Sequence, residues 1–186
     1  MKRLALATVL LAACSGATSE PGPVQTFPDL GADHLTAEAV AAYLAGDESV
    51  VTYNSNPPTS GAHANAWALC GVYRQVIPDP FQVHSLEHGA VIVAYRSDIP
   101  GDVRDEIENL ARELATHIVV APDDDLTPAM ALTAWGRLQT ADDFDVEAFR
   151  SFWAEAAATG PERISCPFEV DEATGESVDF NLLASA

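Results

Sequence analysis

Three of the five histidines in this chain lie between positions 63 and 88, and two of them share one short segment. His84 and His88 are four residues apart, so a helix would place both imidazoles on one face, where they could bind one metal ion. Glu87 could ligate the ion, orient an imidazole or act as a general base. His63 ends a Pro-rich loop that could fold back to supply a third nitrogen. The spacing therefore predicts a metal site built on His63, His84 and His88.

The remaining ligands would decide which metal the site prefers. Met130 is a candidate for a softer fourth ligand: a thioether with imidazoles favours copper(I), whereas imidazoles with Glu87 favour zinc or copper(II). Each residue also has an ordinary explanation, with Met130 in the core, Glu87 as a cap or arginine partner, and His63 as a surface group. His34, in a predicted linker, and His117, at the C-terminus of a predicted helix, are not expected to take part.

The same segment also suggests a hydrolase. The order His-x-x-Glu-His at 84–88 is that of the inverzincin metalloproteases, in which Glu87 would deprotonate a zinc-bound water. Against this, Gly89 and a predicted strand follow the motif at once, whereas the inverzincin motif lies on a longer helix. A downstream acidic ligand would also be needed, and the sequence does not distinguish Glu155 from Glu162 for that role.

The N-terminus has the layout of an export signal. Lys2 and Arg3 precede an apolar run at 4–11, and two alanines then precede Cys14. This pattern is typical of a signal peptide, and its end resembles a bacterial lipobox, in which the cysteine is lipidated. We expect residues 1–13 to be removed, with residues 14–32 forming a lipidated, flexible tether that is rich in Pro, Gly and Ser.

The two other cysteines, Cys70 and Cys166, would then lie in an oxidising compartment. An even number of cysteines there usually pairs, so a disulfide is expected. Two free thiols, or a pair of metal-binding or redox-active thiols, are the alternatives.

Composition limits the possible functions. The 186 residues include 28 acidic side chains against nine Lys plus Arg, a formal charge of −19, and loss of Lys2 and Arg3 with the signal would make it −21. Such a charge repels phosphate backbones, so a nucleic-acid partner is excluded. No apolar run reaches the roughly 18–20 residues of a membrane-spanning helix. The chain is 48% hydrophobic and 20% charged, which is typical of one globular domain, here at 33–186.

Hydrophobic patterns predict how these residues are positioned. Residues 90–95 form the strongest strand, apolar on both faces and therefore central. Residues 102–116 form the clearest amphipathic helix. Further strands are expected at 49–53, 70–77, 117–121 and 130–135, further helices at 36–45 and 146–158, and two short helical turns at 80–88. Because strands and helices do not alternate regularly, we expect a single α+β domain with a mostly antiparallel or mixed sheet packed by two to four helices.

Four motifs together resemble the bacterial domain-of-unknown-function family 3105. They are YNSNPPTSGxH at 53–63, GVY at 71–73, VHSLEHG at 83–89 and TAWG at 133–136, and the similarity runs from about residue 50 to Pro161-Glu162. The family usually has Gly-Pro-His where this chain has Gly61-Ala62-His63. The resemblance implies an exported or membrane-tethered protein and a shared site at the three histidines and Glu87, without naming its chemistry.

The leading hypothesis is a lipid-anchored, metal-binding protein at the extracytoplasmic face of the cell envelope. It would hold copper or zinc at His63, His84 and His88 and attach to the membrane through lipid on Cys14. The alternatives are a zinc-dependent hydrolase with Glu87 as the general base, and a non-metal binding module of the cell envelope. The sequence names no protein partner.

Overall fold

A single mixed sheet organises the chain. The computed structural model describes residues 19–175 and 177–184, and its strands lie in the order β1-β6-β5-β3-β4-β2-β7. The pairs β1–β6, β6–β5 and β5–β3 are antiparallel, whereas β3–β4, β4–β2 and β2–β7 are parallel. The strands are β1 (Gln25–Thr26), β2 (Gly71–Val72), β3 (Val91–Tyr95), β4 (Ile118–Pro122), β5 (Met130–Ala134), β6 (Arg137–Ala141) and β7 (Val170–Asp171).

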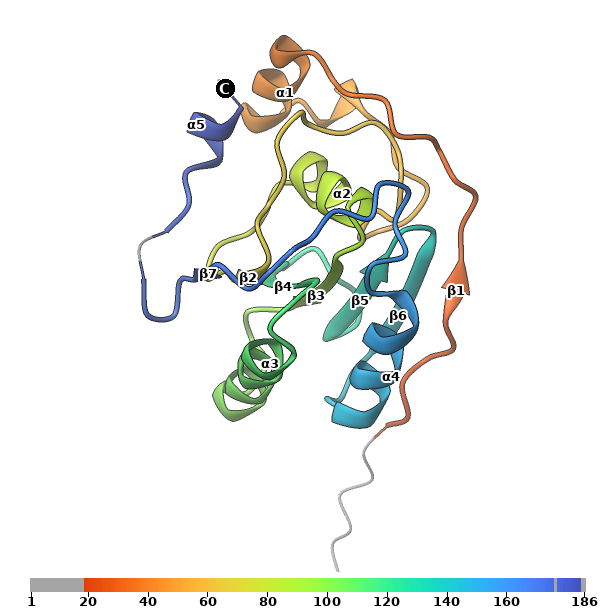
Figure 1. The fold of residues 1–186 in the computed structure, drawn as a ribbon, viewed down its shortest axis with the longest axis vertical. Coiled ribbons are helices and arrows are strands. Elements are labelled where there is room, and N and C mark those ends of the chain that lie inside the picture. Colours follow the sequence, from red (N-terminus) through yellow and green to blue (C-terminus); the bar gives the residue numbers. More distant parts are fainter. Residues whose placement is uncertain (1–18, 176, 185–186) are drawn as a thin grey trace, which may run out of the picture.

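Helices cover both faces of this sheet (Figure 1). On one face, α3 and α4 pack over Val91 and Val93 of β3, and on the other face α2 packs over Ile92. This division follows from the strand period of two, which sends successive side chains to opposite faces. The helices are α1 (Ala37–Leu44), the 3₁₀ turn η1 (Glu48–Val50), α2 (Asp79–Glu87), α3 (Gly101–Leu114), α4 (Val146–Ala156) and α5 (Phe180–Leu183).

The predicted fold class, an α+β domain with a mixed sheet, is confirmed, and the central position of β3 is confirmed with it. Among the described residues there are five α-helices rather than two to four, because the short α5 adds one and residues 80–88 form one helix instead of two turns. No helix in the described part of the chain is long and apolar enough to cross a bilayer.

Three segments differ from the sequence expectation. Residues 49–53 form no strand, because the Asp47 carboxylate accepts the Ser49 N–H and begins a 3₁₀ turn there. The predicted strand at 70–77 pairs only at Gly71–Val72. The strand at 130–135 is half of a hairpin: the chain turns at Gly136, with φ of 69°, and returns as β6.

The segment expected to be a flexible tether contributes an edge strand. β1 pairs with β6, and the Gly22 N–H donates to the Thr140 carbonyl at 2.8 Å. The paired structure therefore begins before Asp33, the expected start of the domain. Residues 1–18, including Cys14 and the expected signal peptide, lie outside the described residues.

Candidate metal centre

Helix α2 carries the central part of the site and is buried on every side. The helix has Pro78 at its N-cap and Pro80 in its first turn. Proline suits these positions because the first N–H groups of a helix have no intrahelical partner. Gly89, with φ of 91°, ends the helix in a conformation that glycine adopts readily. All residues from Pro80 to Glu87 are buried, which brings His84 and Glu87 under the loops that cover the helix.

The Pro-rich loop brings His63 to this helix, as expected. The Ala64 N–H, next to His63, donates to the Pro80 carbonyl at 3.1 Å, and the Tyr53 hydroxyl donates to the Ala62 carbonyl at 2.9 Å. These bonds fix the end of the loop against α2. The His63 side chain is fully buried and its ring centroid lies 4.8 Å from that of His84.

Both imidazoles are oriented by backbone carbonyls. His63 Nδ1 lies 2.9 Å from the Gly61 carbonyl oxygen, and His84 Nδ1 lies 2.7 Å from the Ala64 carbonyl oxygen. A carbonyl only accepts, so each Nδ1 carries the hydrogen and each neutral ring has its lone pair on Nε2. This is how metal-binding histidines are usually held, with the second nitrogen donating to a carbonyl or carboxylate.

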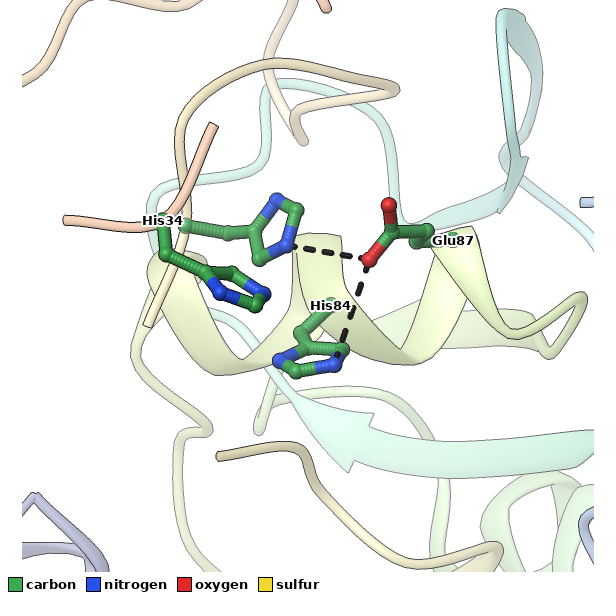
Figure 2. A group of neighbouring side chains, drawn as sticks. His34, His84 and Glu87 are labelled. Carbon is green, nitrogen blue, oxygen red and sulfur yellow. Dashed lines mark ion pairs between the residues drawn. The ribbon is translucent and has the colours of Figure 1, made fainter. Parts of the chain in front are cut away.

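The two Nε2 atoms face one oxygen of Glu87. Glu87 Oε2 lies 3.1 Å from His63 Nε2 and 3.9 Å from His84 Nε2. Figure 2 shows this oxygen directed at both rings, with the other carboxylate oxygen turned away. As a neutral Nδ1–H tautomer, His63 has no hydrogen-bond partner for its buried Nε2. A nitrogen lone pair and a carboxylate oxygen at 3.1 Å require a proton or a cation between them.

His34 joins the group, although the sequence placed it in a linker. Residues 33–35 pair with the end of the loop, because the His63 N–H donates to the Asp33 carbonyl at 3.0 Å and the Leu35 N–H donates to the His63 carbonyl at 2.7 Å. The His34 ring centroid lies 5.0 Å from that of His63. Ligand atoms of His34, His63, His84 and Glu87 all lie within 4.8 Å of one another, so this group could hold a metal ion.

His88 lies beside this group and forms another. Its Nε2 is 3.0 Å from His84 Nε2 and 3.5 Å from Glu162 Oε2. Glu87, His88 and Glu162 place ligand atoms within 4.8 Å of one another. The half-exposed Trp67 ring packs against both His84 and His88. The prediction of one face for His84 and His88 is confirmed, but His88 is grouped with Glu162 rather than with His63.

Burial favours the neutral form of His84 and His88. It lowers the pKa of His84 to about 4, an effect that the Ala64 carbonyl opposes. Burial also lowers the pKa of His88, with the nearby Glu162 carboxylate acting in the other direction. Near neutral pH both rings are therefore neutral, the form that binds metals, and without a metal the 3.0 Å contact is a hydrogen bond from His88 Nε2–H to the lone pair of His84 Nε2.

The sulfur-containing candidates lie elsewhere. Met130 was expected as a possible fourth ligand, but it is buried in the core between the sheet and helices α3 and α4, on the face opposite α2. The alternation of side chains along β5 explains this position. Cys70 and Cys166 form a disulfide, as expected, with their Cα atoms 5.6 Å apart.

The family model described as "Protein of unknown function (DUF3105)" matches residues 46–167, about two thirds of the chain. The chain belongs to this family. No curated protein and no solved structure matches it. His34 precedes the matched region, whereas the other candidate ligands lie within it.

Three of the four motifs of this DUF3105 domain meet at the site or support it. The loop motif supplies His63, and the α2 motif supplies His84, Glu87 and His88. The TAWG motif at 133–136 supports the loop, because the Gly136 N–H donates to the Thr59 carbonyl at 2.9 Å. Residues that are far apart in the sequence therefore build one site and its support.

Proposed function

We propose that this DUF3105 protein binds zinc or copper(II) at the extracytoplasmic side of a membrane. His63, His84 and Glu87 would be ligands, with His34 completing the set. The observation that carries this proposal is the buried meeting of two imidazole Nε2 atoms and a carboxylate oxygen, while both Nδ1 atoms are held by backbone carbonyls.

The rival account places a proton at the same point. A protonated His63 would form an ion pair with Glu87, and the site would then be a structural element of a non-metal binding module. That account explains the 3.1 Å contact of His63 but gives no role to His34, whose ring lies 5.2 Å from that of His84. A cation accounts for all four side chains, because three imidazoles and a carboxylate make a four-ligand set.

The donor atoms favour zinc or copper(II) over copper(I). Imidazole nitrogen and carboxylate oxygen suit the first two, whereas copper(I) prefers sulfur. Of the described sulfur residues, Met130 is in the core and Cys70 and Cys166 are bridged. Glu87 Oε2 lies among the ligand atoms, which supports a ligand role for Glu87 over the general-base role that a hydrolase would require.

The disulfide indicates an oxidising, extracytoplasmic location. Attachment to the membrane through lipid on Cys14 is part of the proposal. An acidic surface would also raise the local concentration of divalent cations near the site.

A metal titration tests the proposal. The full chain is purified with Cys14→Ser, so that the remaining thiol is absent, and with the Cys70–Cys166 bridge intact. After removal of metal with a chelator, zinc and copper(II) are titrated by calorimetry at pH 7.5. We expect a Kd of micromolar or tighter, weakened at least about tenfold by His84→Ala and by Glu87→Gln.

His117→Ala is the matched control, because His117 is the one described histidine outside the two groups. It should bind metal as tightly as the parent. Failure of the parent chain to bind either ion at micromolar concentration would exclude the metal site and leave the proton-bridged pair. Equal affinity in Glu87→Gln and the parent would show that the metal binds elsewhere.

A further inference from the structure

The candidate ligands are too many for one ion. Six side chains converge here, whereas zinc usually takes four ligands in proteins. They fall into two groups that share only Glu87. The first group contains His34, His63, His84 and Glu87, and the second contains Glu87, His88 and Glu162.

Backbone contacts also position the second group. His88 caps the C-terminus of α2. Glu162 follows α4, and its N–H donates to the Glu87 carbonyl at 3.1 Å. Gly160 packs so closely on the end of α2 that a Cβ there would lie 2.2 Å from the Glu87 carbonyl oxygen. The chain thus brings a carboxylate to His88 through main-chain contacts between α2 and the segment after α4.

Glu87 is placed to serve both groups. One of its oxygens is directed at His63 and His84, and the other is turned away from them (Figure 2). A carboxylate can bind one cation through each oxygen, and proteins with two-metal sites hold their ions about 3.5–4 Å apart. His84 Nε2 and His88 Nε2, one from each group, are 3.0 Å apart. This contact joins the two groups, so ions bound in each of them would be neighbours.

The charge of the site also suits two ions. Glu87 and Glu162 both contribute a negative charge, whereas all three imidazoles of the first group and His88 are ligands without charge when neutral. A pair of divalent cations next to each other needs such carboxylates, and the negative charge of the whole chain lowers the repulsion further.

We propose that Glu87 bridges two divalent cations, one held with His63 and His84 and the other with His88 and Glu162. This inference rests on the proposed metal function and extends it from one ion to two. The first ion would lie in the more buried group, and the second beside the exposed Glu162, whose side chain is 53% exposed.

Metal stoichiometry tests the inference. The full chain with Cys14→Ser is titrated with zinc and the bound ions are counted by native mass spectrometry. We expect two ions in the parent chain and one in Glu162→Gln, which leaves the core untouched because the Glu162 side chain is 53% exposed. The control is Glu155→Gln, which removes the same charge from an exposed position on α4 and should keep two ions.

The outcomes separate the two proposals. No bound ion in the parent would overturn both, whereas one ion would overturn only the two-ion inference. Two ions in Glu162→Gln would show that the second ion does not use Glu162. Loading with copper(II) adds a readout by electron paramagnetic resonance that depends on the distance between the ions. Neighbouring ions should couple and reduce the signal per copper, and Glu162→Gln should restore the full signal. A full signal from two coppers in the parent would place them apart and overturn the bridge.

Discussion

Gly160 offers a direct test of how the fold positions the site. A Cβ added there would lie 2.2 Å from the Glu87 carbonyl oxygen, 2.5 Å from the Gly89 nitrogen and 2.6 Å from the Leu86 carbonyl oxygen. All three neighbours are backbone atoms, so no side-chain rotation relieves the contact. Since ordinary contacts are about 3.5 Å, Gly160→Ala must move the segment after α4 away from α2 by about 1 Å.

The movement disturbs packing and hydrogen bonds, and these losses determine how far the free energy of unfolding falls. Overpacking costs about 1–3 kcal/mol. The shift also strains the hydrogen bonds from Glu162 N–H to the Glu87 carbonyl and from Ala158 N–H to the Gly89 carbonyl, each contributing about 0.5–1.5 kcal/mol. We therefore expect Gly160→Ala to lower the free energy of unfolding by about 2–4 kcal/mol.

Urea unfolding followed by circular dichroism, in the presence of a chelator, measures this loss. Gly101→Ala is the matched control, because the nearest atom to its Cβ would be the flexible end of Arg104 at 3.7 Å. It should change stability by less than about 1 kcal/mol. Because Glu162 moves with the segment, the variant should also lose the second metal ion and keep the first. A Gly160→Ala protein that unfolds within 0.5 kcal/mol of the parent would refute the packing argument.

Three further predictions concern stability. Breaking the Cys70–Cys166 bridge, which joins residues 96 apart, should cost about 2–5 kcal/mol, and an unchanged denaturant midpoint after reduction would contradict this. Burial and neighbouring carboxylates raise the pKa of Asp79 to about 6, so the folded state binds more protons than the unfolded state and stability should fall as pH rises from about 4 to 6. Asp79→Asn should remove this pH dependence, which contributes up to about 3 kcal/mol to the free energy of unfolding. Parallel plots of that free energy against pH for variant and parent would contradict this. Glu108, which is 2% exposed, accepts from Arg74 at 3.0 Å, and Glu108→Gln should destabilise by about 1–3 kcal/mol in thermal or chemical unfolding, with no change as the opposing outcome.

Local periodicity was sufficient to predict the part of the site that lies on one helix. His84 and His88 face the same side because they are one helical turn apart, and Glu87 follows from the same geometry. The resemblance of motifs pointed to His63 as well. The central strand β3 and the helices α3 and α4 were also predictable, since their apolar patterns are long and regular.

Contacts made through the backbone could not be predicted from the sequence. His34 enters the site because residues 33–35 pair with His63, and no spacing or motif marks that pairing. The sequence does not distinguish Glu162 from Glu155, because Glu162 reaches the site through the close contact of Gly160 with α2. The sequence left Met130 open between a ligand and a core residue for a related reason, since only the sheet shows which face each residue of β5 occupies.

The polar side chains of α2 argue most directly that the site has a function. A buried polar group costs free energy unless it has a partner, and most of those on α2 have one in the backbone. Gln82 donates to the Ile77 carbonyl, Ser85 donates to the Ala68 carbonyl, and His84 Nδ1 bonds to the Ala64 carbonyl. The buried atom of the site that lacks a hydrogen-bond partner is His63 Nε2, which faces Glu87 Oε2. Because a nitrogen lone pair and a carboxylate oxygen face each other there, this contact is the feature of α2 that the proposed metal ion would account for.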